Sequence, residues 1–239
     1  MHPRTAAAAA KPIHQNTGNV MLETLIALPV VLVLGLSVAQ WALVHQARAV
    51  VDHATLMAAR AGAVNHAEMA PMRNAFARAL VSLKTPKQTA RGFESAFFTK
   101  ALPDSRVHMR LRLLNPTQEA FADHARVDYQ SRRYLPYRDL RRAPSRIGRQ
   151  SQISVQDAGL LSVQATYGYP LNMPFAGAFI LQAVQLATRF TRHYDARERV
   201  MLASSRLPII TTATIRMQSR LYQSRHLPNR ADLVRHNNQ

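Results

Sequence analysis

An uncharged apolar stretch near the N-terminus constrains the fold of this chain more than any other feature. From Thr24 to Val44 the sequence TLIALPVVLVLGLSVAQWALV contains no Asp, Glu, Lys or Arg. As a helix it would be about 32 Å long, close to the thickness of the hydrocarbon core of a bilayer. A buried core helix of this length normally keeps a polar face, and a cleaved secretory signal has a shorter apolar region. We therefore favour a membrane-spanning helix over these two alternatives.

The rest of the chain is strongly basic. Lys and Arg number 31 against 13 Asp and Glu, which gives a formal net charge of +18. An apolar content of 47% is too high for general disorder, and the absence of Cys excludes disulfides and thiolate metal sites. Basic residues lie on both sides of the apolar stretch, so charge does not fix its orientation. We expect a short cytoplasmic N-terminus, because the long downstream part can be translocated whatever its charge.

A polar leader ends at Gly18, and Glu23 follows five residues later at the edge of the apolar stretch. A carboxylate pulled to the middle of a bilayer costs up to about 2.5–3.5 kcal/mol, so Glu23 is expected to have a partner. Pro29 lies inside the stretch, where it removes one helical hydrogen bond and favours a kink.

The Gly18 to Glu23 junction resembles the prepilin-peptidase site of type IV pilins and pseudopilins, and Pro29 also resembles that group. The resemblance implies cleavage after Gly18 and a new ammonium group at Asn19. Glu23 of the same or a neighbouring subunit would neutralise that ammonium in an assembly salt bridge within a low-dielectric bundle. Processing would then switch assembly on. Many pilins have Phe or Met where this chain has Asn19, which leaves N-methylation open.

Two stretches of the C-terminal half narrow the resemblance. Residues 163–171 read VQATYGYPL and are followed by Met173-Pro174-Phe175, while residues 207–217 read LPIITTATIRM. Both resemble TadE-like proteins, the pseudopilins of tight-adherence (Flp-type) pili, as do residues 46–49 and 58–63 beyond the membrane helix. The intervening Arg-rich part has no such counterpart.

That family implies a single-pass inner-membrane protein with its C-terminal domain in the periplasm or on a surface filament. The implied partners are prepilin peptidase, other pilin and pseudopilin subunits, the pilus assembly platform and inner-membrane lipid.

The sequence predicts an α+β fold, in which a long N-terminal transmembrane and stalk helix precedes a small antiparallel-sheet, pilin-like domain. Apolar residues recur every three or four positions in a predicted helix, Ala67–Leu83. Apolar and polar residues alternate in three predicted strands, Arg106–Leu114, Leu161–Tyr167 and Ile209–Met217. The expected parts are a leader (1–18), a transmembrane helix (19–44), a helical stalk (45–66), an α+β domain (67–222) and a basic tail (223–239).

Two segments of the predicted domain need separate interpretation. Ser131–Arg149 contains seven Arg, one Asp and two Pro, and is predicted to be an exposed mobile or edge loop. Phe175–Ala187 is apolar but too short to cross a bilayer. It either lies on the membrane surface or forms a buried helix over the sheet.

No sequence motif indicates catalysis, so we expect no enzyme, cofactor or metal site. The motifs of P-loop, dinucleotide-binding, zinc-protease and α/β-hydrolase sites are all missing. His45 and His53 are two helical turns apart, too far to share a metal, and His66 stands near Glu68. Asp123 and Asp128 are interpreted as a loop residue and a strand-edge residue.

Two functional hypotheses follow. The first is a pseudopilin or minor pilin that contributes to pilus biogenesis and surface adhesion. The alternative is a membrane-anchored basic module that binds nucleic acid, anionic lipid or acidic polysaccharide by counterion release. Nucleic acid is disfavoured, because only Tyr129, Tyr134 and Tyr137 accompany the Arg cluster and no nucleic-acid-binding fold is recognisable. Anionic surface polymers remain plausible contacts of so basic a chain.

Overall fold

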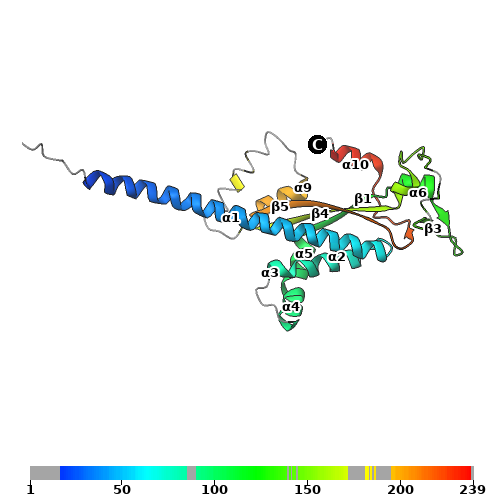
Figure 1. Cartoon of the computed structure of the whole chain (residues 1–239), viewed down its shortest axis with the longest axis horizontal. Helices are drawn as coiled ribbons and strands as arrows, with labels where there is room; N and C mark the ends of the chain where they lie inside the picture. Colours follow the sequence, from blue (N-terminus) through cyan, green and yellow to red (C-terminus); the bar gives the residue numbers. More distant parts are fainter. Residues whose placement is uncertain are drawn as a thin grey trace, which may run out of the picture.

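In the computed structural model a long helix extends from one end of a small α+β body (Figure 1). The structure describes residues 17–84, 90–138, 140, 142–143, 145–171, 181–182, 184, 186 and 195–237. The helices are α1 (Thr17–Val64), α2 (Met69–Ala79), α3 (Val81–Lys84), α4 (Ala90–Ala96), the π-helix η1 (Phe97–Ala101), α5 (Leu102–His108), α6 (Gln118–His124), α7 (Val155–Ala158), α9 (Ala196–Ala203) and α10 (Arg230–Asn237). The strands are β1 (Met109–Asn115), β2 (Arg126–Val127), β3 (Arg133–Leu135), β4 (Leu160–Pro170), β5 (Arg206–Arg216) and β6 (Leu221–Tyr222).

Helix α1 joins the predicted membrane helix and stalk in one continuous element of 48 residues. At about 1.5 Å per residue it is about 72 Å long. Its first half is exposed, whereas its second half buries Ala47, Val51, Ala54 and Ala58. These residues recur at steps of four, three and four and so form a single stripe. The small side chains of that stripe allow the helix to pack closely on the body.

The main sheet has the strand order β1-β4-β5, and both pairs are antiparallel. Central strand β4 buries Leu161, Val163, Ala165 and Tyr167, which alternate as the sequence predicted. Leu111 of β1 and Thr211 of β5 lie opposite Ala165 on its two sides. The long helix, the antiparallel sheets and the surrounding short helices confirm the predicted α+β class.

Helices α1 and α2 lie side by side and α1 packs on β4 and β5 (Figure 1). One buried polar contact fixes α1 on the sheet: the hydroxyls of Thr55 and Thr211 are 2.5 Å apart. The hydroxyl of Thr55 also donates to the carbonyl of Val51 at 2.8 Å. Because a hydroxyl has one proton, Thr211 is the donor to Thr55.

The N-terminal part of the first predicted strand is helical instead. Residues 106–108 belong to α5, and β1 begins only at Met109. Val107, one of the apolar residues in that alternating pattern, is 69% exposed. Pro103 at the start of α5 and Asp104 in its first turn are favourable helix-start residues, and they outweigh the alternating pattern of residues 106–108.

The Arg-rich segment 131–149 is not simply a loop, which corrects the prediction. Its residues Arg133–Leu135 form β3, the middle strand of a second small sheet with the order β2-β3-β6. Leu135 and Leu140 are buried although arginines surround them in the sequence. Burial of these two apolar side chains anchors a segment whose charge suggested a solvated loop.

The remaining predicted segments have mixed outcomes. The predicted helix Ala67–Leu83 is found as two helices, α2 and α3. Most of Phe175–Ala187 and residues 1–16 of the leader lie outside the described residues. Residues 181, 182, 184 and 186 are helical, with Leu181 buried and Leu186 exposed, and the two alternatives for this segment stay open. In the basic tail, Arg230–Asn237 forms α10.

Candidate functional site

The N-terminal half of α1 is an apolar rod exposed on all sides. Its large exposed apolar side chains extend from Met21 to Trp41, whereas Gln40 has an exposed fraction of 0% and marks where the body begins to cover the helix. The 21 residues from Met21 to Trp41 rise by about 32 Å, close to the hydrocarbon thickness of a bilayer. This helix is the one candidate membrane span in the described part of the chain. The chain thus has the features of a single-pass membrane protein.

The three residues of the predicted processing and assembly site lie at the start of this rod. Gly18 and Asn19 are in the first turn of α1, and Glu23 is exposed one turn beyond Asn19. Helix positions four apart share a face, and side chains lean toward the helix N-terminus. Asn19 and Glu23 therefore lie on one face of α1, one helical turn apart. Within the described residues Glu23 forms no ion pair, so the rod presents one carboxylate among apolar side chains.

Pro29 lies inside α1, which continues through it to Val64. The kink predicted at Pro29 remains a prediction. Further along, the hydroxyl of Ser37 donates to the carbonyl of Val33 at 2.8 Å, so this donor has a hydrogen-bond partner within the helix.

The C-terminal end of α1 is fastened to the chain just before β6. Gln218 N and Ser219 Oγ donate to the carbonyl of Ala63 at 3.0 and 2.9 Å. His66, with a positive φ of 55°, places its Nδ1 at 2.6 Å from the carbonyl of Arg220. Since a carbonyl only accepts, Nδ1 must carry the proton. His66 is thus an exposed turn residue at the end of the stalk.

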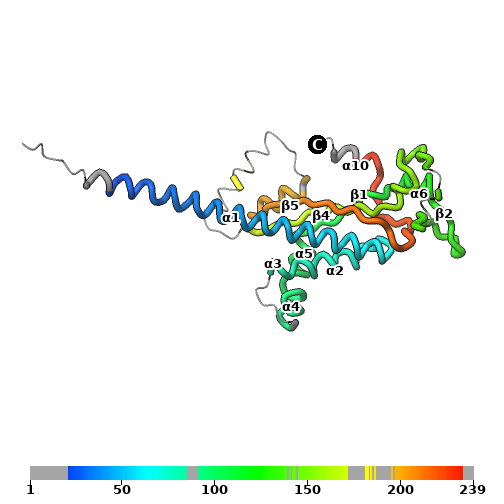
Figure 2. Tube along the Cα trace, in the orientation of Figure 1, coloured from blue at the N-terminus to red at the C-terminus, as the bar shows by residue number. Residues whose placement is uncertain are grey.

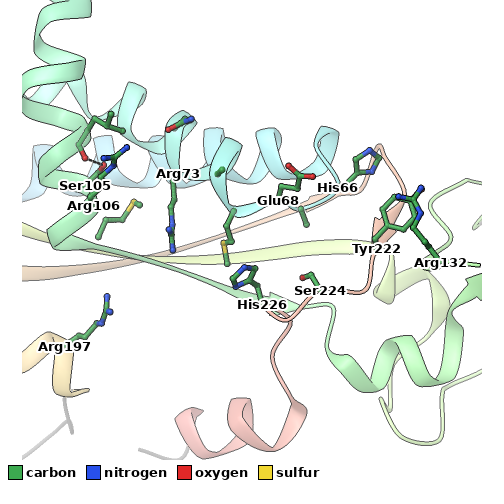
Figure 3. A pocket seen from close by; sticks show the side chains of 16 residues that line it. His66, Glu68, Arg73, Ser105, Arg106, Arg132, Arg197, Tyr222, Ser224 and His226 are labelled. Carbon is green, nitrogen blue, oxygen red and sulfur yellow. Dashed lines mark hydrogen bonds between the residues drawn. The ribbon is translucent and has the colours of Figure 1, made fainter. Parts of the chain in front are cut away.

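A cationic cleft of about 1120 Å³ opens between α2, α5 and the segment after β6 (Figure 3). Arg73 of α2 and Arg106 of α5 enter it from one side, and His226 and Arg197 lie on the other (Figure 3). Glu68 is its one acidic lining residue in the part of the chain that the structure describes. Four arginines line the cleft; Arg132 pairs with Asp128, whereas Arg73, Arg106 and Arg197 form no ion pair with a described residue and can take anionic partners.

A second cationic cavity, of about 400 Å³, lies beside the β2-β3-β6 sheet. Its polar lining residues are Arg126, Arg138, Arg142, Arg220, Tyr134 and Tyr137. The sheet lies at the end of the molecule opposite the exposed half of α1, as Figure 1 and Figure 2 show. Reasoning from sequence noted the tyrosines of the Arg-rich segment but missed Arg220 and Tyr222, which reach this end through the pairing of β3 with β6.

The remaining candidates have structural roles. Asp123 accepts hydrogen bonds from Gln150 N and Ser151 N at 2.9 and 2.7 Å, and Asp128 accepts them from Gln130 N and Arg132 N at 2.8 and 2.9 Å. Each carboxylate therefore organises a turn. Asp123 itself lies in α6 and not in the loop expected for it, whereas Asp128 directly follows β2. His45 and His53 are exposed on α1. No group of three or more His, Asp or Glu suited to a metal occurs among the described residues.

One carboxylate that the sequence analysis did not single out is central to the body. Asp104 lies within 3.3 Å of Tyr167, Arg206, Lys84 and His108. Burial raises its pKa, but the hydrogen bond from Tyr167 and the charges of Lys84 and Arg206 outweigh burial, so that the pKa is lowered overall. This cluster ties α5 to β4 and β5.

An exposed apolar rod followed by a small α+β body fits a single-pass membrane protein. Residues 18–60, which begin at Gly18 and end within the stalk, match the family described as TadE-like protein. The match confirms the resemblance to that family drawn from the sequence. The chain matches no curated protein and no solved structure.

Proposed function

We propose that this protein is a pseudopilin or minor pilin of a tight-adherence (Flp-type) pilus system. Prepilin peptidase removes residues 1–18, and the helix from Asn19 anchors the subunit in the inner membrane with its body on the periplasmic side. The role is structural rather than catalytic. The subunit contributes to pilus biogenesis and surface adhesion through contacts with other pilin subunits and the assembly platform.

The observation that carries the proposal is the position of Glu23 on the bare half of α1. A lone carboxylate at the edge of a membrane helix is costly unless a cation neutralises it. Cleavage after Gly18 creates such a cation one helical turn away, at Asn19, on the same face of the helix as Glu23. The match of residues 18–60 to the TadE-like family begins at the residue after which cleavage is proposed.

The neutralising contact also explains why assembly would follow processing. Before cleavage Asn19 N is an uncharged amide, and Glu23 has no ion-pair partner among the described residues. After cleavage the ammonium of one subunit can meet Glu23 of the same subunit or of a neighbour. Helices that pack side by side through such a pair have a preferred register, because the pair is strong only at short distance in a low dielectric.

The proposal is tested by the N-terminal residue of the protein recovered from cells with and without prepilin peptidase. We expect Asn19 with the enzyme and Met1 without it. Gly18→Ala should block the cut, while Gly35→Ala is a matched control, because a Cβ at Gly35 meets nothing within 4 Å. An N-terminus at Met1 in both strains would refute processing.

A further inference from the structure

The end of the molecule farthest from the exposed half of α1 carries a set of paired arginines and tyrosines (Figure 1). The guanidinium carbon of Arg132 is 4.3 Å from the ring centre of Tyr222, that of Arg220 is 5.0 Å from Tyr134, and that of Arg138 is 5.3 Å from Tyr137. We refer to these six residues as the arginine–tyrosine surface. It comes from β3, β6 and the segments that flank them.

The arginine–tyrosine surface joins the two cationic cavities. Tyr222 and Arg132 line the larger cleft, whereas Tyr134 and Arg220 line the smaller cavity. The rings of Tyr134 and Tyr222 meet edge to face with their centroids 6.5 Å apart. A flexible polymer could therefore contact both cavities at once, while a small anion could fill only one.

Among the described residues, the negative charge at this surface is already engaged. Asp128 contacts Arg132, with Nε and Oδ2 3.3 Å apart, but its side chain is 1% exposed and its Oδ1 accepts two backbone hydrogen bonds. The smaller cavity is lined by four arginines and by no acidic side chain among the described residues. Arg126, Arg138 and Arg142 are exposed, and Arg220 is half-buried. The surface is thus a cationic site whose arginines can still take anionic partners.

The stacking determines which anions fit. A guanidinium that lies over a tyrosine ring is held in a fixed plane, and its outward N–H edge can bind a carboxylate or sulfate group through two parallel hydrogen bonds. The same stacking occupies the tyrosine faces that single-stranded nucleic acid would need for its bases. Tyr222 in particular contacts Arg132, Tyr134 and His66.

We propose that the arginine–tyrosine surface is a binding site for acidic polysaccharide, which it holds by carboxylate or sulfate groups on successive sugars. The tyrosines position the arginines, and the larger cleft provides further cationic contacts through Arg73 and Arg106. This activity goes beyond a role in pilus assembly and does not depend on processing after Gly18.

Binding is measured with the full chain in a neutral detergent. Alginate oligosaccharides supply carboxylates and heparin oligosaccharides supply sulfates, while oligothymidylate, anionic-lipid nanodiscs and neutral dextran are the comparisons. At physiological salt we expect one of the two acidic saccharides to bind at least about tenfold more tightly than oligothymidylate or the nanodiscs. Tighter binding of nucleic acid or lipid would overturn the proposal, as would equal binding of dextran.

Paired variants distinguish a specific binding site from general electrostatic attraction to a basic chain. Arg138→Gln with Arg220→Gln should weaken saccharide binding by about a hundredfold, if each arginine contributes one charged hydrogen-bonded contact. Arg91→Gln with Arg216→Gln removes the same charge from exposed positions on α4 and β5, and should weaken it by less than about threefold. Equal losses in the two pairs would show diffuse attraction and refute the site.

Two single variants check that a loss of binding is not caused by misfolding and that the planar shape of the guanidinium matters. Arg142 is exposed, so Arg142→Gln should keep the circular dichroism spectrum and still weaken binding by about tenfold. Arg220→Lys keeps the charge but loses the planar fork, so we expect about a fivefold loss, and unchanged binding would contradict the stacked-guanidinium mechanism. Gly18→Ala should leave saccharide binding intact, so the binding proposal and the processing proposal can fail independently of each other.

Discussion

The hydroxyl of Tyr167 donates a hydrogen bond to Oδ2 of Asp104 at 2.6 Å, in the region where α5 meets the main sheet. Tyr167 has an exposed fraction of 0%, and burial, together with the Asp104 hydrogen bond, raises its pKa. Arg206 approaches the other oxygen of the carboxylate at 3.0 Å, and Lys84 approaches Oδ2 at 3.1 Å. One carboxylate therefore connects α3, α5, β4 and β5.

Tyr167→Phe should lower the free energy of unfolding by about 1–2 kcal/mol, because the carboxylate loses a buried donor while its two cations remain. Urea denaturation of the detergent-solubilised chain, followed by near-UV circular dichroism, measures the change. Tyr169→Phe is the matched control, since no hydrogen bond of its hydroxyl is found within the described residues. A loss in the control as large as in Tyr167→Phe would mean that packing, not the hydrogen bond, is responsible.

The lowered pKa of Asp104 predicts a loss of stability in acid. A carboxyl with a lower pKa in the folded state stabilises the fold fully above its unfolded value, near 3.9, and this contribution disappears as the pH falls through the folded value. Asp104→Asn should therefore be much less stable than the parent at pH 7. The gap should shrink steadily below about pH 4. Denaturation at pH 7, 5 and 3 tests this, and a gap independent of pH would show that the Asp104 charge is not the cause.

The contact between Thr55 and Thr211 predicts a strongly non-additive pair. Thr55→Val should cost about 1–3 kcal/mol, because it leaves the buried hydroxyl of Thr211 without its acceptor. The double variant Thr55→Val with Thr211→Val should recover most of that loss, since two apolar groups of the same shape then meet. A thermal or urea double-mutant cycle gives the coupling energy. Additive losses would contradict the role assigned to the pair.

Glu23 is expected to matter for assembly and not for cleavage. Glu23→Gln keeps the shape of the side chain but removes the charge, so the leader should still be cut after Gly18. Incorporation into pilus fractions should fall by tenfold or more, because removing one partner of a buried ion pair costs about 3–5 kcal/mol. Immunoblots of sheared filaments and membranes measure the two steps. Ser37→Ala is a control on the same helix, and identical behaviour of Glu23→Gln and Gly18→Ala would refute the separate roles.

The sequence was most informative where one physical signal dominates. The uncharged apolar stretch predicted the exposed half of α1, and the alternation of Leu161, Val163, Ala165 and Tyr167 predicted β4. It was least informative where a weak local pattern competes with distant contacts. Residues 106–108 alternate like a strand, but α5 is held by Asp104, whose partners Lys84, Tyr167 and Arg206 are spread along the chain.

The arginine–tyrosine surface shows the same limit at the candidate binding site. The density of charge in residues 131–149 predicted a solvated loop, yet Leu135 and Leu140 anchor the segment and β3 pairs with β6. Arg220 and Tyr222 meet Tyr134 only through that pairing. No periodicity in the sequence relates positions so far apart.

The fastening of α1 to the residues before β6 has a mechanical consequence. Tension applied at Arg220 or Tyr222 reaches Ala63 and His66 directly, through the short bonds that join the two segments. From there it runs lengthwise along a single helix, α1. The main sheet packs beside that helix, so this load does not have to pass through its strand pairs.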